Sequence, residues 1–197
     1  MSGNNTDWAA LVADLNALLR LRTTPIGMKL FESVSAMEAI PKIRRPGSTG
    51  SDGVKYATDQ IVAQAARLNW TVGVTADDLL GGSCTAVLGL SAQDAAWRSG
   101  RDMAGVWFAT VEDAARHKAA MHVVPHGRYR AMAVSPLATG RLDPPDICMV
   151  YATPGQMILL INGLQWSGYK RFDWSVTGES ACADSWGRAL ATGEPSL

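Results

Sequence analysis

The stretch Arg141–Trp166, RLDPPDICMVYATPGQMILLINGLQW, predicts a turn, a short strand and a helix in direct succession. Two prolines and two aspartates at 143–146 are typical of a turn, because proline fixes its own backbone and aspartate bonds to nearby N–H groups. Residues 147–152 then form an apolar run of strand length. We therefore expect a short strand here that leads directly into a helix.

Two features of this stretch mark where the helix begins. Thr153 can cap the free N–H groups, and Gln156, three residues on, can reach back to complete a capping box. Pro154 takes the first helical position, where its missing N–H costs nothing. The helix that follows is apolar nearly all round, which predicts that it lies in the core. Its apolar residues are Met157, Ile158, Leu159, Leu160, Ile161 and Leu164.

Composition and charge argue against several classes of protein. The chain has 197 residues, enough for one well-buried domain, and a formal net charge of zero. A neutral chain lacks the basic face of a nucleic-acid binder. No apolar run reaches the roughly 18 residues of a membrane helix, and the first residues do not resemble a signal peptide. Three cysteines without tight spacing fit a reducing compartment, so we expect a cytoplasmic protein.

Helix and strand patterns are interspersed along the rest of the chain. Helical spacing predicts an amphipathic helix from Trp8 to Leu19 capped by Thr6, and alternation predicts a half-buried strand at 28–32. Without strict βαβ repetition, the pattern predicts an α+β fold, a mixed β-sheet with packed helices in a single domain, residues 1–197. Further strands are expected at 70–74, 103–108, 130–137 and 172–177, and further helices at 58–68, 83–88, 110–121 and 180–190.

The segment at residues 41–54, PKIRRPGSTGSDGV, is rich in proline, glycine and serine and predicts a mobile loop. Its basic residues Lys42, Arg44 and Arg45 could clamp an anion. A solvated basic loop is the alternative, and the sequence leaves both roles open.

The cysteines are the residues best suited to carry chemistry. Cys84 and Cys182 each fall in the predicted first turn of a helix, just after a small polar cap, where the helix dipole and free N–H groups favour the thiolate. Cys148 lies inside the strand of the opening stretch. Thiolates converging from two helix starts and one strand could hold a metal ion or an iron–sulfur cluster. The alternative is that each cysteine is a small buried hydrophobic residue.

Other chemical motifs are weak or missing from the sequence. His122 and His126 have metal-ligand spacing, but the intervening Val-Val-Pro prevents one helix from holding both. A cysteine–histidine nucleophile, such as Cys84 or Cys182 with His126, stays open. The sequence contains no phosphate-binding loop, dinucleotide fingerprint or nucleophile elbow, so no nucleotide cofactor is expected.

The helix start at Thr153 is a candidate site for a substrate anion. Backbone N–H groups of Gly155 and Gln156 could bind a carboxylate or a phosphate. Gln156 is also the ordinary closing residue of a capping box, so a structural role is the alternative.

Four segments, spread in order over essentially the whole chain, point to a known family. They are LRLRTTPIGMKLFES, ADDLLGGSCTAVLGL, PPDICMVYATPGQMILLINGLQW and TGESACADSWGRALATGEPSL, and their specific points are Pro25, Gly27, Lys29, Cys84, Leu88, Gly89, Leu90, Pro154, Gln156, Ser180 and Cys182. In these residues the chain resembles the family called domain of unknown function 169. The resemblance implies a prokaryotic cytoplasmic protein whose recurring cysteines suit a metal or cluster. Lys29 is expected to join Gly155 and Gln156 in binding the substrate.

The chain departs from the family pattern in two places. Family members often carry a cysteine where this chain has residues 55–60, and they usually continue past the segment that ends here at Leu197. The resemblance therefore implies that a complete cluster needs groups from elsewhere. We expect a second subunit or a homo-oligomer to supply them.

These expectations combine into one functional hypothesis and one alternative. The hypothesis is a subunit of a small-molecule enzyme that acts on a small anionic or aromatic substrate. Cys84 and Cys182 would be ligands of an iron–sulfur cluster or metal ion, with Cys148 as a third cofactor-binding residue, and an open iron position could polarise the substrate. The alternative is a non-catalytic ligand-binding or accessory module with structural cysteines and an aromatic-lined pocket, suggested by the seven tryptophans.

Overall fold

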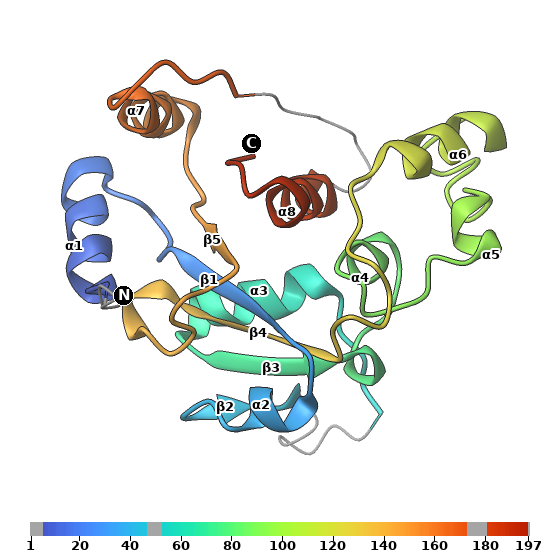
Figure 1. The fold of residues 1–197 in the computed structure, drawn as a ribbon, viewed down its shortest axis with the longest axis horizontal. Helices are drawn as coiled ribbons and strands as arrows, with labels where there is room; N and C mark the ends of the chain where they lie inside the picture. Colours follow the sequence, from blue (N-terminus) through green and yellow to red (C-terminus); the bar gives the residue numbers. More distant parts are fainter. Residues whose placement is uncertain (1–5, 47–52, 173–180, 197) are drawn as a thin grey trace.

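The computed structural model describes residues 6–46, 53–172 and 181–196, with the backbone alone for 181–183. The expected strand at 172–177 falls almost entirely outside these residues, as does Ser180, the expected cap of the last helix. Much of the expected loop at 41–54 also lies outside them. The fold is thus built from the three described segments (Figure 1).

One mixed sheet of five strands forms the centre of the described structure. Its strand order is β2-β3-β4-β1-β5, with β2 parallel to β3 and every other neighbouring pair antiparallel. This arrangement confirms the predicted α+β fold with a mixed sheet. The strands are β1 (Ile26–Phe31), β2 (Ile43–Arg44), β3 (Thr71–Thr75), β4 (Ala131–Pro136) and β5 (Ile147–Met149).

Helices cover both faces of this sheet. Helices α3 and α8 pack on one face, α2 packs on the other, and α5 and α6 form a lobe beyond α4 (Figure 1). Helices α1 and α7 lie on the side of the molecule away from that lobe. The helices are α1 (Trp8–Leu19), α2 (Val34–Glu38), α3 (Thr58–Leu68), α4 (Ser83–Val87), α5 (Ala95–Arg98), α6 (Val111–Ala120), α7 (Pro154–Gln165) and α8 (Ala181–Thr192).

Alternation along the strands divides the buried side chains between two cores. Met28 and its alternate neighbours in β1 join the larger core with α3 and Trp186 of α8. Phe31, Ala131 and Ala133 face the other way, toward Met37 of α2. Because elements cover both faces, β1 is buried almost throughout, and the predicted half-buried strand is corrected to a nearly fully buried one.

The turn predicted at 143–146 is confirmed, and it is fixed to strand β1. Asp146 donates its N–H to the Met28 carbonyl at 2.8 Å and accepts the Leu30 N–H on Oδ2 at 2.7 Å. The Trp8 indole N–H donates to Asp143 Oδ1 at 2.8 Å, which also ties α1 to the turn. The opening stretch of sequence thus organises the edge of the sheet.

Helix α7 begins as predicted but does not lie in the core. Thr153 and Gln156 form the capping box, with the Thr153 N–H donating to Gln156 Oε1 at 2.7 Å. No residue of α7 is buried, and Ile158 and Leu159 keep 60% and 55% of their surface exposed. The prediction of a core helix was wrong because an apolar helix needs a covering partner, and no other described element packs closely over α7.

Three smaller predictions are also corrected, two about where a helix begins and one about a strand. Asp7, rather than Thr6, caps α1 by accepting the Ala10 N–H at 3.0 Å. Gly82 precedes α4 as its cap, so Ser83 is the first helical residue. Residues 103–108 form a turn in which the Met103 carbonyl accepts three N–H groups, rather than a strand.

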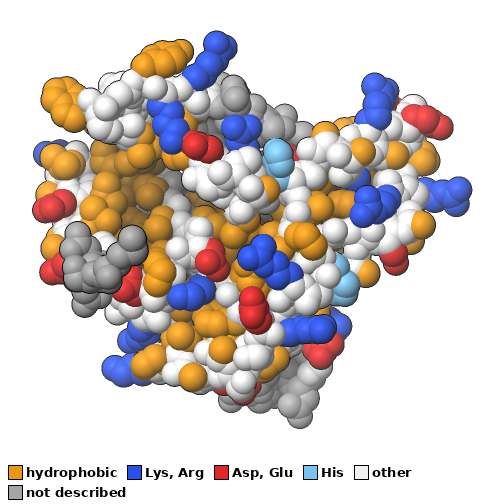
Figure 2. All heavy atoms as spheres, viewed as in Figure 1, with side chains coloured by type: hydrophobic (Ala, Val, Ile, Leu, Met, Phe, Trp, Pro, Cys, Tyr) orange, Lys and Arg blue, Asp and Glu red, His pale blue; other side chains and the backbone are white. Residues whose placement is uncertain are grey.

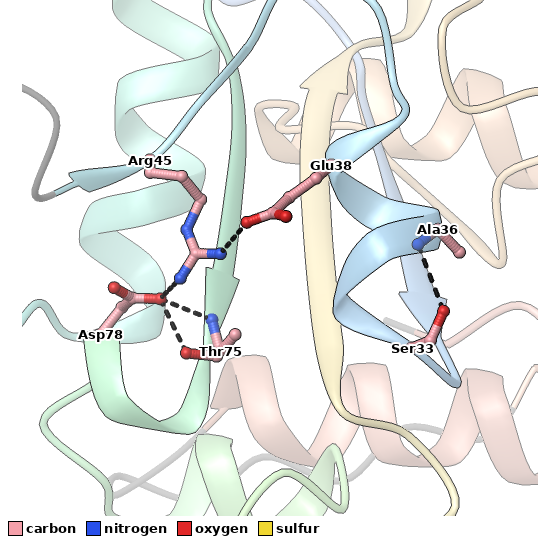
Figure 3. A network of polar contacts seen from close by, with 6 residues as sticks. All are labelled: Ser33, Ala36, Glu38, Arg45, Thr75 and Asp78. Carbon is pink, nitrogen blue, oxygen red and sulfur yellow. Dashed lines mark hydrogen bonds and ion pairs between the residues drawn. The ribbon is translucent and has the colours of Figure 1, made fainter.

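Arginine 45 of the basic segment binds carboxylates of this chain. Its guanidinium contacts Glu38 Oε1 at 3.0 Å and Asp78 Oδ2 at 2.7 Å (Figure 3). Asp78 Oδ2 also accepts the Thr75 N–H at 2.7 Å. Arg44 stacks over the Trp70 ring at 4.4 Å. Both arginines therefore hold β2 and its neighbours in place.

Among the described residues, no helix combines the length and apolar character needed to cross a membrane.

Candidate functional site

Cys84 lies where the sheet core meets the α5–α6 lobe. It is the second residue of α4, so its predicted place in the first turn is confirmed. Its half-buried side chain packs against the main core and against a smaller cluster that contains Val87, Met121 and Trp97. The thiol is thus held between two packed regions, at the base of the lobe.

The helix that carries Cys182 packs directly on the helix that carries Cys84. Cys182 is the second residue of α8, which begins at Ala181, so its position in a first turn is also confirmed. Contact is close at Gly187, where an added Cβ would clash with the His122 carbonyl and lie 2.6 Å from Val87 Cγ1. The structure therefore brings the two cysteine-bearing helices together, while the Cys182 side chain lies outside the described atoms.

Cys148 lies on the opposite face of the sheet from this junction. Ile147 and Met149 point into the core shared with α8, so the residue between them points away, and its side chain is exposed. Protein atoms around the sulfur displace water and raise the pKa of the Cys148 thiol above its ordinary value. The structure does not bring Cys148 together with Cys84, and its predicted role as a cofactor ligand stays a prediction.

Metal-ligand side chains do not converge anywhere in the described parts of the chain. Over those residues, no group of three or more His, Cys, Asp or Glu side chains is arranged to hold an ion. His126 Nδ1 lies 3.1 Å from the Gly89 carbonyl, which requires the ring nitrogen to be the donor. A Cys84–Cys182 pair would therefore need further ligands from outside this set.

The three residues predicted to bind substrate belong to β1 and α7, outside the α4–α8 junction. Lys29 Nζ donates to the carbonyls of Pro144 at 2.9 Å and Asp143 at 3.4 Å, which holds the turn beside β1. Gln156 Nε2 donates to Leu19 at 2.7 Å and links α7 to α1. Gly155 is exposed in the first turn of α7. Substrate binding by these residues stays a prediction, beside the structural contacts that Lys29 and Gln156 make.

A cavity that the sequence did not indicate lies between α5 and α6. Its volume is about 170 Å³, and its walls come from Trp97, Arg98, Lys118, Ala119, Met121 and Val123. Lys118 is 2% exposed, and its Nζ donates to both carboxylate oxygens of Asp102 at 2.8 and 2.9 Å. The cavity shares Trp97, Met121 and Val123 with the apolar cluster against which Cys84 packs.

One signal in the sequence could have pointed to this lysine. Lys118 follows Ala114 by four residues and precedes Met121 by three, so it shares a helical face with two buried residues. A lysine on an apolar face is buried only when it has a partner. The partner, Asp102, is sixteen residues away in a turn, and no local pattern connects the two.

Comparison with known proteins gives one match. The model of the family named domain of unknown function 169, described as uncharacterised ArCR, matches residues 14–197. The chain belongs to this family. The match includes Lys29, the three cysteines and both helices of the α4–α8 junction. No similar curated protein and no similar solved structure was found.

Proposed function

We propose that this protein is a subunit of an enzyme that acts on a small anionic or aromatic molecule, with its reactive centre at the α4–α8 junction. The observation that carries the proposal is the packing of two helices that each present a cysteine as the second residue. A helix start stabilises a thiolate through its dipole and its unpaired N–H groups. Cys84 and Cys182 are therefore the proposed ligands of a metal ion or an iron–sulfur cluster.

The cysteines at the junction supply only some of the ligands that a metal ion or an iron–sulfur cluster needs. Thiolates are the usual ligands of iron–sulfur clusters, which commonly take four of them. The junction offers two cysteines, and Cys148 lies on the other face of the sheet. The remaining ligands would come from a partner subunit or a second copy of the chain. When bound, the group would supply a Lewis acid that polarises a substrate oxygen.

Anaerobic purification of three single variants tests this proposal. We expect the unmodified protein, alone or with its partner, to show visible absorption together with iron and labile sulfide. Cys84→Ser and Cys182→Ser should each remove the absorption, while the matched control Cys148→Ser should keep it. A colourless protein without bound metal, in the presence and absence of partners, would contradict the proposal.

A second candidate function is a non-catalytic module that binds or carries a small ligand. Figure 2 shows a hollow, lined largely by hydrophobic side chains, on the side of the molecule where Figure 1 places α1 and α7. Exposed apolar residues on these elements include Leu18 and Ile158. Surfaces of this kind mark sites of interaction. Thiols at Cys84 and Cys182 with ordinary reactivity, in a protein without metal, would favour this second function.

We also propose that the protein works in the cytoplasm with a second subunit or as a homo-oligomer. Helix α7 supports this, because its apolar residues are exposed and would lose contact with water in an assembly. Tyr151, Trp166 and Tyr169 extend the same apolar segment beyond both ends of the helix. Aromatic residues of this type are enriched at the centre of protein interfaces.

A further inference from the structure

We propose that the apolar surface of α1 and α7 binds one amphipathic helix of a separate protein, a helix with acidic residues at both ends of its apolar stripe. This inference rests on the first of the two proposed functions, an enzyme subunit with a partner, and deepens it by naming the chemistry of that partner. We call this the α1–α7 surface, and it consists of the exposed apolar side chains Leu11, Leu18, Ile158, Leu159 and Leu164.

The two helices of this surface meet where α1 ends and α7 begins. Gln156 Nε2 donates to the carbonyls of Leu19 at 2.7 Å and Arg20 at 3.1 Å. Leu18, which keeps 77% of its surface exposed, precedes this contact in α1, and Ile158 follows Gln156 within one turn of α7. Exposed apolar side chains of both helices therefore lie near one another.

The α1–α7 surface lies on the side of the molecule that Figure 2 shows hollowed and lined largely by hydrophobic side chains. A hollow apolar surface suits a convex apolar element, as when an amphipathic helix lies in a hydrophobic groove. Helix α7 has 12 residues and is about 18 Å long, so a partner helix of about three turns would run its full length. A lipid surface is flat on this scale and would leave the hollow unfilled.

Unpaired positive charges lie at both ends of α7, and the helix itself contains no charged residue. Arg20 and Arg22 are exposed near its start, and Arg171 is exposed after its end. Over the described residues, none of these three arginines has a carboxylate within ion-pair distance, whereas Lys170 is paired with Glu194. The surface is therefore apolar in its middle and positive at both ends.

The charge pattern favours a different protein over a second copy of the chain. Asp14 is the one acidic residue of the two helices, and segments 15–31 and 147–172 contain none. Each copy would thus bring three arginines but a single carboxylate to a symmetric contact, and like charges brought together there weaken association. A helix with acidic residues at both ends pairs with the same arginines, and the repulsion between copies adds to its specificity.

A displayed peptide library, selected on the full chain, tests the chemistry of the partner. Every peptide carries leucines at helical spacing and randomised residues at both ends. We expect the selected peptides to be enriched in aspartate and glutamate at both ends. The same selection on the arginine variant, Arg20→Gln/Arg22→Gln/Arg171→Gln, should lose this enrichment, because the charges that favour acidic ends are gone.

Fluorescence anisotropy of a synthetic copy of the most enriched peptide measures its affinity. The arginine variant should bind about tenfold more weakly, since exposed ion pairs contribute little singly and three act together here. Ile158→Gln/Leu159→Gln should remove measurable binding, because the apolar centre is lost. The matched control Arg67→Gln/Arg101→Gln/Arg130→Gln removes three exposed arginines outside the two helices and should bind as the unmodified chain does. All these positions are exposed, so the fold should be kept.

Three results would overturn the proposal. One is selection without acidic enrichment, or with the same enrichment in the arginine variant. Another is a dimer of the chain alone, seen by native mass spectrometry and lost in Ile158→Gln/Leu159→Gln, which would assign the surface to a second copy. The third is sedimentation with vesicles of phosphatidylcholine and phosphatidylserine that the arginine variant loses, which would assign it to a membrane. Cys84→Ser/Cys182→Ser should bind the same peptide, so a failure of the cysteine centre is distinguishable from a failure of this surface.

Discussion

Cys148 combines an exposed side chain with a thiol pKa raised by the loss of water around its sulfur. A raised pKa means that less thiolate is present at any given pH below it, and the thiolate is the form that reacts. We expect alkylation of Cys148 by iodoacetamide to be slow near neutral pH. It should gain speed only at a higher pH than for the same cysteine in the urea-unfolded chain. Peptide mass spectrometry gives both rates, and coincident pH profiles would contradict the expectation.

Thr153 supports the start of α7 through its side chain and its backbone. Thr153→Ala removes the cap, which should cost helix α7 about 1 kcal/mol. Because α7 packs little against the rest of the chain, we expect local fraying, seen as faster hydrogen exchange at 155–160, with little change in global unfolding. Thr153→Ser keeps the hydroxyl and is the control. Equal exchange rates in both variants would exclude a capping role.

The roles of single residues were predictable only where their partners are near in sequence. Thr153 and Gln156 were assigned because a capping box spans three residues. Lys29 and Gln156 also bind carbonyls more than one hundred residues away, and only the folded chain shows these contacts. The cavity residues were missed for the same reason, since Lys118 and Asp102 are apart in sequence.

Helix α8 depends on a glycine for its contact with α4. Gly187→Ala would force a methyl group against the His122 carbonyl and Val87, so the helices must separate. Overpacking of this kind costs about 1–3 kcal/mol, measurable as a lower urea midpoint of unfolding. Gly163→Ala in α7 is the matched control, because an added Cβ there meets nothing within 4 Å. Helix propensity favours alanine there by about 1 kcal/mol.

If both alanine variants unfold at the same urea concentration, the close approach of α8 to α4 is not a determinant of stability. Loss of stability in Gly187→Ala alone should also change the alkylation rate of Cys84, because the thiol lies beside the same contact.

Helices and strands with a clear apolar periodicity were predictable from the sequence, and the way they pack against one another was not. The β1, β3 and β4 strands and the α1, α3 and α6 helices appear within a few residues of their predicted places, because their apolar patterns reflect burial on definite faces. The strand order and the exposure of α7 depend on contacts between distant segments. An apolar helix predicts burial, but the sequence does not say whether the cover comes from the same chain.

At the scale of the whole molecule, the exposed apolar side chains of α7 predict that the protein assembles with a partner or with a second copy of the chain. Replacing Ile158 and Leu159 by Gln should shift the native mass toward the monomer if α7 lies at an interface between copies, or reduce capture of a separate subunit. The free energy of unfolding of the isolated chain should change little, since both side chains are already exposed. Native mass spectrometry of the chain alone and with its genomic neighbours measures both effects.

Leu68→Gln, at an exposed position in α3, is the control for a general loss of apolar surface. An unchanged mass distribution and unchanged capture in the α7 variant would remove α7 as an interface. A shift of equal size in the control would assign the effect to solubility.

The sheet also separates two of the cysteines, Cys84 and Cys148, which lie on its opposite faces. Cys84 packs into the core on one side, and Cys148 points out from the other, so a disulfide between them would require the backbone to move. Oxidation in air should instead join the exposed Cys148 of two molecules. A dimer on a non-reducing gel that disappears in Cys148→Ser would therefore be a product of handling, to be separated from any assembly built on α7.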